Sequence, residues 1–574
     1  MNELYPVYTL KNECNDCYKC VRECHVKAIK IQDGHASILS DKCISCGSCV
    51  RACPAGAKRI RYDIEKAQKL IQSQRKVFVS LAPSWAGVFD YSAPLMIGLL
   101  KKLGFAAVSE TALGAQEVSI ATADMLENAE KDLYISSCCP VIVDYVRIYN
   151  SKFTRNIMSL ASPALTHAKM LKQIYGDIDI VFIGPCIAKK NEATKHPELI
   201  NAALTFEELN YWIKEKFISI QEIEITDDNK FVPEDAYEGS LYPVEGGMNE
   251  TIRQSGIGDD VQLISISTLD TFEKALNGFN PEKISRKIFV EALGCPAGCV
   301  NGPALASKKA GINITSDILA KIQKRDAIPA EVRVLVPESY PENPVDRKSY
   351  SLDEMVTGMK KIGKQTEEDE LNCGGCGYLS CRDMVRALLS GNAEPSMCVS
   401  YMRKIAMRKT AAMLRCMPSA IVMVDNELNV VEANDAFMRM FCGDLYDVFA
   451  SRPNGLEGAA IDRIIDFADL FKQALKSEKD IHKEHFPVKD RLYDISAFTI
   501  EPDEIVGAII TDVTKSEINR EKIAKKAREV IMKNVTTVQE IAGLLGEHMV
   551  ETELLLNSIA HDYDPDNEAD GDVH

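Results

Sequence analysis

The chain has 574 residues, which at about 150 residues per domain predicts about four domains. Apolar residues make up 46% of it and aromatic residues 7%, values typical of a globular protein with hydrophobic cores. Acidic residues outnumber basic ones by 84 to 67, and the net charge of -17 argues against a nucleic-acid-binding surface. The unusual number is 19 cysteines, of which 17 fall in short, metal-type clusters rather than a disulfide framework.

The hydrophobic pattern predicts neither a signal peptide nor a membrane helix. The opening residues, MNELYPVYTL, lack a basic stretch followed by an apolar one. The apolar runs VFVSLA, IVFIGPCIA and EIVGAII are as long as strands and fall short of the ~18 residues that a membrane helix needs. We therefore expect a protein of the reducing cytoplasm.

Changes of composition along the chain predict six segments. After a short cysteine-rich segment, apolar strands alternate with helices, which predicts a two-lobed α/β domain. A proline-rich connection, PESYPENPVDRKS, and a charged helix, KKIGKQTEEDE, then lead to a second cysteine module. Short strands and helices follow, then a long helix and an acidic tail that we expect to be disordered. The predicted segments are 1–62, 75–340, 365–405, 414–515, 516–560 and 561–574.

Two cysteine runs in the first segment repeat the spacing C-x2-C-x2-C-x3-C. This is the pattern of a two-cluster bacterial ferredoxin, in which the fourth cysteine of each run binds the other cluster. We therefore predict two electron-carrying [4Fe-4S] clusters; zinc, the alternative for a lone CxxC, is disfavoured by the double register. The predicted ligands are Cys14, Cys17, Cys20 and Cys53 for one cluster and Cys43, Cys46, Cys49 and Cys24 for the other.

Five further cysteines stand in three motifs of the α/β domain. Each motif is near the end of a predicted strand, among prolines and glycines. Any one of these cysteines alone is typical of a small buried apolar side chain, but together they indicate one buried metal site built from distant loops. The motifs are SSCCP, GPCIAKK and EALGCPAGCVNG, with Cys138, Cys139, Cys186, Cys295 and Cys299.

With these three motifs in this order after a two-cluster ferredoxin segment, residues 1–310 resemble the [FeFe]-hydrogenases. The resemblance implies a [4Fe-4S] cluster held by four of the cysteines and bridged through Cys299 to a diiron subsite that carries CO, cyanide and azadithiolate. This composite, the H-cluster, would interconvert H2 with two protons and two electrons and exchange electrons with ferredoxin or a similar carrier. The implied ligands are Cys139, Cys186, Cys295 and Cys299.

The resemblance also implies roles for residues that bind no iron. Cys138 would be free, and a thiol with a pKa of about 8.5 suits a proton shuttle to the azadithiolate amine. Lys189 matches the lysine that pairs with a cyanide ligand. Pro83 and Ser84, in LAPSW, resemble the segment that lines the same pocket; a plain loop is the alternative.

Several positions depart from the family pattern and predict a divergent branch. Gly184 and Leu293 stand where many members have methionine, and the tryptophan that often follows the first motif is missing. The acidic residues Glu117, Asp124 and Glu127 do not match the usual proton relay. They are candidates for another proton route, although solvated helix charges are the favoured alternative.

A third cysteine group follows the α/β domain with the spacing C-x2-C-x4-C-x16-C. It resembles a small four-iron domain of anaerobic electron-transfer proteins, so we predict a further [4Fe-4S] cluster, with zinc as the alternative. The predicted clusters therefore number four, besides the diiron subsite. The ligands of this last cluster would be Cys373, Cys376, Cys381 and Cys398.

Residues 414–515 resemble a PAS domain, with an acidic turn at Asp425 and Asn434 and Phe437 in an N-x-A-F pattern. His482 and His485 stand among charged residues, which favours surface histidines over haem ligands. The two remaining cysteines are interpreted as structural. They are Cys416 and Cys442.

The helix that follows carries apolar residues at alternating steps of four and three, which is typical of a coiled coil and predicts a homodimer. An amphipathic helix packed on its own domain is the alternative. The seam consists of Ile531, Val535, Val538, Ala542, Leu545, Met549, Thr552, Leu556 and Ile559.

Two functions follow from these patterns. The first is an [FeFe]-hydrogenase that works with ferredoxin. The second is a sensor of H2 or redox state that signals through the PAS domain and the coiled coil to a separate protein. The retained cysteines and Lys189 disfavour a third, a catalytically dead iron–sulfur assembly factor.

Overall fold

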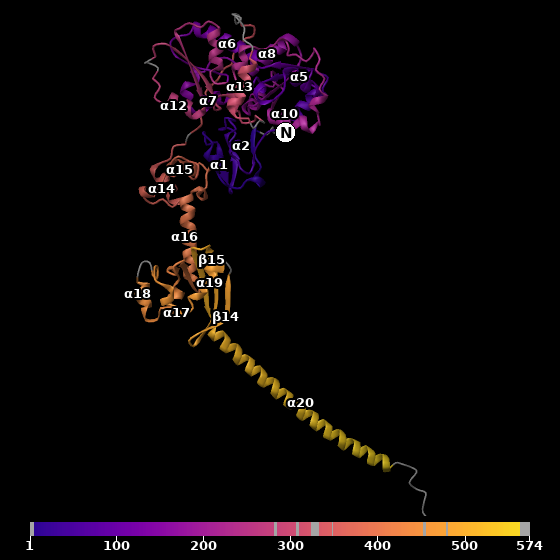
Figure 1. The fold of residues 1–574 in the computed structure, drawn as a ribbon, viewed down its shortest axis with the longest axis vertical. Helices are drawn as coiled ribbons and strands as arrows, with labels where there is room; N and C mark the ends of the chain where they lie inside the picture. The colour runs from indigo at the N-terminus through magenta and orange to yellow at the C-terminus, as the bar shows by residue number, and fades with distance from the viewer. Residues whose placement is uncertain are drawn as a thin grey trace, which may run out of the picture. The chain divides into compact units, whose positions relative to one another are not determined.

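The computed structural model describes residues 5–280, 284–305, 309–322, 332–346, 348–451, 455–477 and 480–562. The chain divides into two compact units, Met1–Met402 and Arg403–His574 (Figure 1). The predicted multidomain α+β and α/β architecture is confirmed: ferredoxin-type, two-lobed α/β and PAS domains are all present. Among the described residues no helix is both long and apolar enough to cross a membrane.

The N-terminal module is built from two similar halves around two small sheets. Strand β1 pairs antiparallel with β4, and β2 with β3. The halves match in backbone conformation as well as in cysteine spacing, because Asp16, Tyr18 and Lys27 have positive φ and so do Ser45, Gly47 and Gly56 at the equivalent positions. The elements are β1 (Val7–Thr9), α1 (Lys19–Arg22), β2 (Ile29–Gln32), β3 (His35–Ile38), α2 (Ser48–Ala52) and β4 (Lys58–Ile60).

The α/β domain contains two parallel sheets, one for each lobe. The larger has the order β6-β5-β8-β9 and the smaller β10-β11-β7. Every residue of β5 and β8 is buried, as expected of parallel strands covered on both faces. The strands are β5 (Val77–Leu81), β6 (Ala107–Glu110), β7 (Leu133–Ile135), β8 (Asp179–Gly184), β9 (Ala202–Thr205), β10 (Val261–Ser267) and β11 (Lys287–Leu293).

Helices between the strands cover both sheets. Helix α6 packs on α8, which contacts β5 of the larger sheet, and on α11, which contacts β10 of the smaller sheet. Helix α7 contacts both β11 and α9. The helices are α3 (Ile64–Gln72), α4 (Trp85–Val88), α5 (Ala93–Lys102), α6 (Ala112–Glu127), α7 (Pro140–Tyr149), α8 (Pro163–Tyr175), α9 (Ala188–Lys195), α10 (Phe206–Glu215), α11 (Gly247–Gln254), α12 (Leu269–Leu276) and α13 (Gly311–Lys321).

The proline-rich connection is not a free linker. Its backbone is hydrogen-bonded along the α/β domain, for example from Asn343 N–H to the carbonyl of Arg147 and from Val345 N–H to that of Ile148. The prediction of a charged helix at KKIGKQTEEDE is wrong. The helix here is α14, Leu352–Lys361, and it ends where Gly363 takes a positive φ.

The second cysteine module follows α14. Helix α15, Cys381–Leu389, begins at Ser380, whose hydroxyl caps Asp383 N–H, and α16, Val399–Cys416, leaves the module directly after Cys398. Residues 403–416 of α16 already belong to the second unit.

The PAS domain has a five-stranded antiparallel sheet of order β13-β12-β16-β15-β14. Asn434 joins its parts, because its side-chain carbonyl accepts from Ile421 N–H and Phe437 N–H at 2.9 Å. The elements are β12 (Ala420–Asp425), β13 (Val430–Ala433), α17 (Asp435–Phe441), α18 (Tyr446–Ala450), α19 (Asp469–Ser477), β14 (Ile481–Val488), β15 (Arg491–Glu501) and β16 (Ile505–Asp512).

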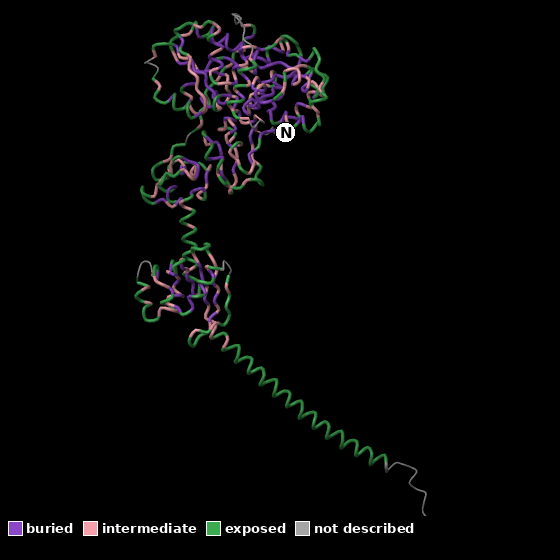
Figure 2. Tube along the Cα trace, viewed as in Figure 1, coloured by how far each residue is buried: buried purple, intermediate pink, exposed green. Residues whose placement is uncertain are grey.

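A single helix, α20, runs over Thr514–Asp562, and Figure 2 shows it exposed along its length. It contains the whole predicted heptad seam. Of the predicted acidic tail only the first two residues are described, at the end of α20; residues 563–574 lie outside the described part.

Candidate functional site

The three cysteine motifs of the α/β domain stand at the carboxyl ends of parallel strands, where ligands bind in open α/β folds. Cys139 follows β7 and occupies the N-cap of α7, with Pro140 in its first turn. Cys186 follows β8, and its sulfur accepts hydrogen bonds from the backbone N–H groups of Ala188 and Lys189 at the start of α9. Helix N-termini stabilise anionic ligands, so both turns suit thiolates.

These motifs converge on one cavity of about 100 Å³ between the two lobes. Four of the five motif cysteines line it, and the fifth, Cys295, lies close enough to act electrostatically on Cys299, Cys186 and Cys139. Apolar and proline side chains form much of the rest of the wall. The predicted residues in the lining are Pro83, Ser84, Cys138, Cys139, Cys186, Lys189 and Cys299.

Burial dominates the electrostatics of this cavity. It raises the pKa of Cys186 to about 11, and it also raises the pKa values of Cys295 and Cys299. Neighbouring cysteines raise them further, whereas Lys189 lowers those of Cys186 and Cys299. A set of buried thiolates is therefore stable only with bound cations, as in a metal cluster.

Two polar groups face the cavity from the larger lobe. Lys189 is buried, and its Nζ donates to Ser162 Oγ at 2.7 Å and pairs with Glu192 Oε2 at 2.6 Å. Ser84 Oγ is buried and has no hydrogen-bond partner among the described residues. The orphaned hydroxyl indicates a polar ligand, because buried polar groups are normally hydrogen-bonded. Lys189, which is also paired with Glu192, is a charged donor that suits an anionic ligand.

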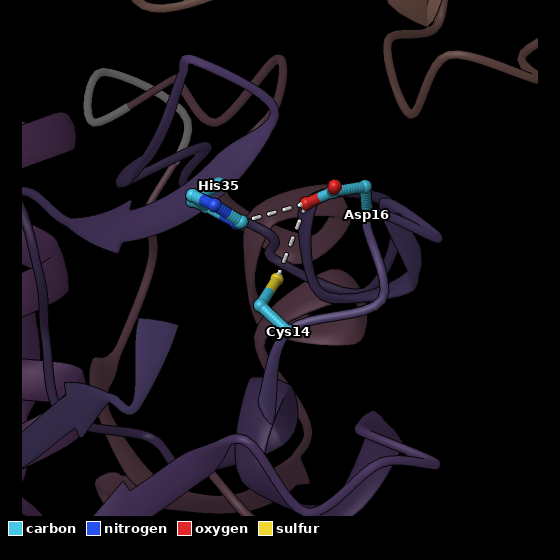
Figure 3. Close-up of side chains that lie close together, drawn as sticks. All are labelled: Cys14, Asp16 and His35. Carbon is cyan, nitrogen blue, oxygen red and sulfur yellow. Dashed lines mark hydrogen bonds and ion pairs between the residues drawn. The ribbon is translucent and has the colours of Figure 1, made fainter. Parts of the chain in front are cut away.

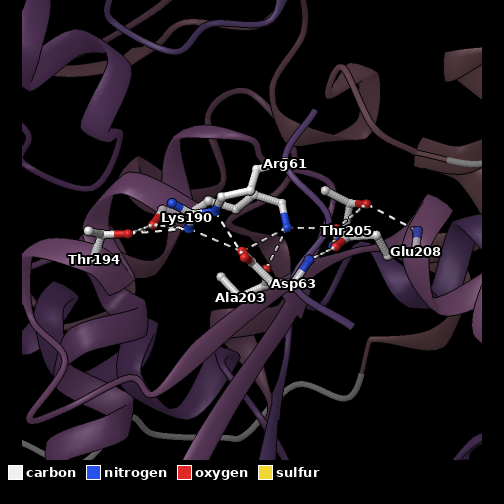
Figure 4. A network of polar contacts seen from close by, with 7 residues as sticks. All are labelled: Arg61, Asp63, Lys190, Thr194, Ala203, Thr205 and Glu208. Atoms are coloured by element: carbon white, nitrogen blue, oxygen red, sulfur yellow. Dashed lines mark hydrogen bonds and ion pairs between the residues drawn. The ribbon is translucent and has the colours of Figure 1, made fainter. Parts of the chain in front are cut away.

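A buried salt-bridge network fixes helix α9, which carries Lys189 (Figure 4). Lys190 is 0% exposed and pairs with Asp63 at 3.1 Å and Glu208 at 2.7 Å. Arg61 pairs with Asp63 at 2.9 Å and donates to the carbonyl of Lys190. The segment that leaves the ferredoxin-type module is thereby tied to α9 and to the start of α10.

Cys138 lies on the side of the cavity next to the smaller lobe. Its Sγ is 3.5 Å from Met248 Sδ, and its side chain is hydrogen-bonded with that of Tyr242. Burial raises its pKa, so the sulfur holds its proton more tightly than a free thiol does. The charged groups that act on it are Lys189, which lowers its pKa, and Glu291, which raises it.

Glu291 is a site residue that the cysteine spacing does not single out, although it is the first residue of the motif EALGCPAGCVNG. It is 1% exposed within β11, and its carboxylate accepts from Met248 N–H and Asn249 N–H at the start of α11 and from Ser265 Oγ. Burial raises its pKa to about 7. The signal in the sequence is an acidic residue inside a buried strand, four residues before Cys295.

The three acidic residues of α6 lie apart from this cavity. Asp124 and Glu127 are exposed, as expected of solvated charges. For Glu117 that interpretation is wrong, because the residue is buried and its carboxylate accepts from Arg333 Nε at 2.8 Å and Arg333 N–H at 2.7 Å. Glu117 thus anchors the segment after α13.

The ferredoxin-type cysteines form two groups. Burial raises the pKa values of Cys24 and Cys49. The charge of Cys46 raises the pKa of Cys24 further, and the charges of Cys46, Cys43 and Cys24 do the same for Cys49. These four cysteines therefore lie together. Cys20 is affected by Cys14 and Cys17. The grouping of Cys24 with the second run is the exchange expected of two-cluster ferredoxins.

The rim of the first group carries two further polar residues, Asp16 and His35 (Figure 3). Cys14 Sγ lies 3.6 Å from Asp16 Oδ1, and His35 Nδ1 lies 3.3 Å from the same oxygen. The three could hold a metal ion in isolation. Because Cys14 also belongs to the first cysteine run, the trio is the edge of that site.

The second cysteine run lies directly against the α/β domain. A Cβ on Gly47 would be 2.6 Å from the side chains of Ile187 and Pro303. Ile187 follows Cys186, so the loops of the two cysteine groups touch at Gly47, the glycine of the second run.

The four cysteines of the second module line one small hollow. In the PAS domain, His482 and His485 are exposed on β14, and Cys416 is exposed at the end of α16. Cys442 is half-buried.

Four family models match the chain. Residues 75–303 match the iron only hydrogenase large subunit, C-terminal domain. Residues 13–67 match a 4Fe-4S dicluster domain, 369–400 a model for an Fe-S cluster, and 408–482 a PAS domain.

The matching proteins are distant. Iron hydrogenase 1 of Clostridium pasteurianum is 22% identical over 307 residues, 43% of this chain and 53% of that protein. The periplasmic [Fe] hydrogenase large subunit of Nitratidesulfovibrio vulgaris is 26% identical over 258 residues, 36% of this chain and 61% of that protein. The chain therefore spans little more than half the length of these relatives. A solved [FeFe]-hydrogenase from Chlamydomonas reinhardtii aligns with 50% of this chain and 100% of its own, at 16% identity and a TM-score of 0.39.

The motifs, the shared cavity and the family models lead to one assignment. Residues 75–303 are similar to the C-terminal domain of the iron-only hydrogenase large subunit, and the chain that contains them resembles a divergent [FeFe]-hydrogenase with a PAS domain.

Proposed function

We propose that this protein is an [FeFe]-hydrogenase that interconverts H2 with protons and electrons and exchanges the electrons with ferredoxin or a similar carrier in the cytoplasm. The observation that carries the proposal is the cavity between the lobes on which the three cysteine motifs converge. Strands of both sheets deliver four cysteines to it, together with a buried lysine and an orphaned serine hydroxyl.

The residues fit an H-cluster. Cys139, Cys186, Cys295 and Cys299 would hold its [4Fe-4S] part, and Cys299 would also bridge to the diiron subsite with its CO, cyanide and azadithiolate ligands. Lys189 Nζ and Ser84 Oγ would donate to its anionic ligands, and Pro83 would shape the wall. When bound, this group would supply an iron with an open position for H2.

The chain itself would move the protons. Cys138 Sγ, which stays protonated because of its burial, would exchange a proton with the bound group. Glu291 is a carboxyl group whose charge raises the pKa of Cys138, and its own pKa of about 7 lets it hold or release a proton near neutral pH. Ser265, hydrogen-bonded to Glu291 at 3.1 Å and half-buried, continues the route toward solvent.

Electrons would pass through the ferredoxin-type module. Its second cysteine run packs through Gly47 on Ile187, the residue after Cys186, so the loops of the two cysteine groups are in contact. The eight cysteines of the module would hold two [4Fe-4S] clusters, and the first run would face the external carrier.

A second function, sensing of H2 or redox state, is favoured by the connection to the PAS domain. Cys398 of the second cysteine module immediately precedes α16, which ends at the first strand of that domain. The signal would then reach a separate protein through α20, which we propose to pair with α20 of a second copy.

The test is to mature the full-length protein with the diiron cofactor and record infrared bands together with H2 oxidation and evolution. We expect CO and cyanide bands and turnover in both directions. Cys138→Ala should keep the bands and lower turnover by about 100-fold or more, since a positioned proton donor contributes that much. Absence of the bands would refute the site, and full turnover in Cys138→Ala would refute the shuttle.

A further inference from the structure

A buried lysine lies against the second cysteine module. Lys364 is 4% exposed and lines the hollow that also contains the four cysteines. Its Nζ donates to Ser400 Oγ at 2.8 Å, and the same oxygen is 3.4 Å from Cys398 Sγ. Among the described residues no carboxylate forms a salt bridge with it.

An ammonium group buried in this way needs an anion, because an unpaired buried charge costs several kcal/mol. The anions that the hollow can place beside Lys364 are the thiolates of its four cysteines. Four thiolates around a [4Fe-4S] core carry net negative charge, and an added electron makes the charge more negative. A fixed cation beside them therefore favours the reduced form.

The module that contains Lys364 is docked on the ferredoxin-type module. Gly377 has a φ of +93°, and a Cβ on it would lie 3.0 Å from Arg22 N and from Val21 Cγ1. Arg22 Nη1 donates to the carbonyl of Gly375 at 3.2 Å. Val21 and Arg22 lie in α1, between Cys20 and Cys24, so the two cysteine-bearing segments touch directly at Gly377.

Two side chains lie close to cysteines of both modules. Burial lowers the pKa of Lys27, and the charges of Cys24 and Cys376 oppose this shift. Burial raises the pKa of Tyr378, and the charges of the same two cysteines raise it further. At the outer edge, Glu394 accepts from Asp33 N–H at 2.6 Å and Gly34 N–H at 3.3 Å. The contact therefore extends from α1 to the β2–β3 hairpin.

We propose that the cluster of Cys373, Cys376, Cys381 and Cys398 is an electron outlet of the ferredoxin-type module, and that Lys364 is the countercharge that holds the electron there. Oxidation of one H2 releases two protons and two electrons. One electron would reduce this cluster core from 2+ to 1+, the other would stay in the ferredoxin-type clusters, and the protons would leave through the active site. The H2-derived source rests on the proposed function.

The experiment is a redox titration of the full-length protein with reconstituted clusters, followed by electron paramagnetic resonance. Cys373→Ala identifies the signal of this cluster by removing it. In Lys364→Met we expect the ratio of reduced to oxidised cluster at fixed potential to fall about tenfold, a shift of about 59 mV for one electron. Lys361 is an exposed neighbour, so Lys361→Met should leave this ratio unchanged. Lys364→Arg keeps the positive charge and should give a ratio between those of Lys364→Met and the unmodified protein.

An unchanged midpoint in Lys364→Met with full iron content would overturn the role of Lys364. The contact between the two modules is tested by the width of the paramagnetic resonance signals, because reduced clusters in neighbouring modules broaden each other's signals. Ferredoxin-type signals that do not sharpen in Cys373→Ala would overturn the outlet. Both titrations use chemical reductants, so a failure to reduce the clusters with H2 would contradict the proposed function alone.

Discussion

Glu291 illustrates how one buried residue can set a pH dependence. Its carboxyl group has a pKa of about 7, raised by burial against three hydrogen bonds that lower it. In the proposed route, the ionised form above that pH would accept protons from Cys138, which would favour H2 oxidation. Below that pH the protonated form would supply them, which would favour H2 evolution.

We therefore predict that Glu291→Gln lowers turnover in both directions by about 100-fold and removes the ionisation near pH 7 from the rate profile. Initial rates on both sides of pH 7 measure this. Glu127→Gln, at an exposed carboxylate of α6, is the matched control and should change neither the rate nor the profile. A Glu291→Gln enzyme with a normal profile would show that protons leave by another route.

At the scale of residues, the sequence predicts the grouping of cysteine ligands better than it predicts the role or burial of acidic residues. Cysteine ligands follow fixed local spacings, so the spacing alone is enough to group Cys24 with the second run. Glu291 cannot be found in this way, because the N–H groups that hold it come from Met248 and Asn249, distant in the chain. The burial of Glu117 is missed for the same reason, since its partner Arg333 follows more than two hundred residues later.

At the scale of elements, the Lys190 network determines how α9 presents Lys189 to the cavity. Lys190→Met removes the ammonium that pairs with buried Asp63 and Glu208, while Arg61 still pairs with Asp63. Losing this buried cation costs about 3–5 kcal/mol. We predict a lower urea midpoint and faster hydrogen exchange in α9 and β9.

The control for this prediction lies on the same helix. Lys195 pairs with Asp144 but its side chain is 48% exposed, so Lys195→Met should cost less than about 1 kcal/mol. Equal effects of the two substitutions would mean that the buried network does not stabilise the α9 region specifically.

The strands of the α/β domain can be predicted because buried parallel strands are continuous apolar runs, as in VFVSL. The order of those strands, and the convergence of their ends on one cavity, depend on long-range pairing that a local pattern does not encode. The proline-rich connection has the composition of a linker, yet its backbone groups pair with residues of the α/β domain. The end of α14 is misplaced by the charge pattern because the charged residues continue past Gly363.

At the scale of the whole molecule, the two units carry different chemistry. The first contains all sixteen cysteines that we propose as cluster ligands, and the second contains only Cys416 and Cys442. A report of the redox state that uses the PAS domain would pass from the first unit into the second, which the chain enters at Arg403 within α16.

The second unit ends in α20, whose apolar seam is exposed within the single chain. Leu545 is 62% exposed on the seam, and Leu544, one residue earlier and off the seam, is 60% exposed. Such a row of large apolar side chains gains about 1.5–3 kcal/mol for each one fully buried against a partner. A second copy presents the same row in the same register, as in a parallel coiled coil.

We predict that the full-length protein sediments as a dimer and that Leu545→Glu shifts it toward monomer at the same concentration, because a carboxylate would be buried in the seam. Leu544→Glu should leave the dimer intact, since its side chain points away from the partner. H2 turnover should be equal in both variants, which separates assembly from catalysis. If the unmodified protein sediments as a monomer, or if both substitutions act alike, the seam is not the dimer interface and α20 must be covered by a different partner.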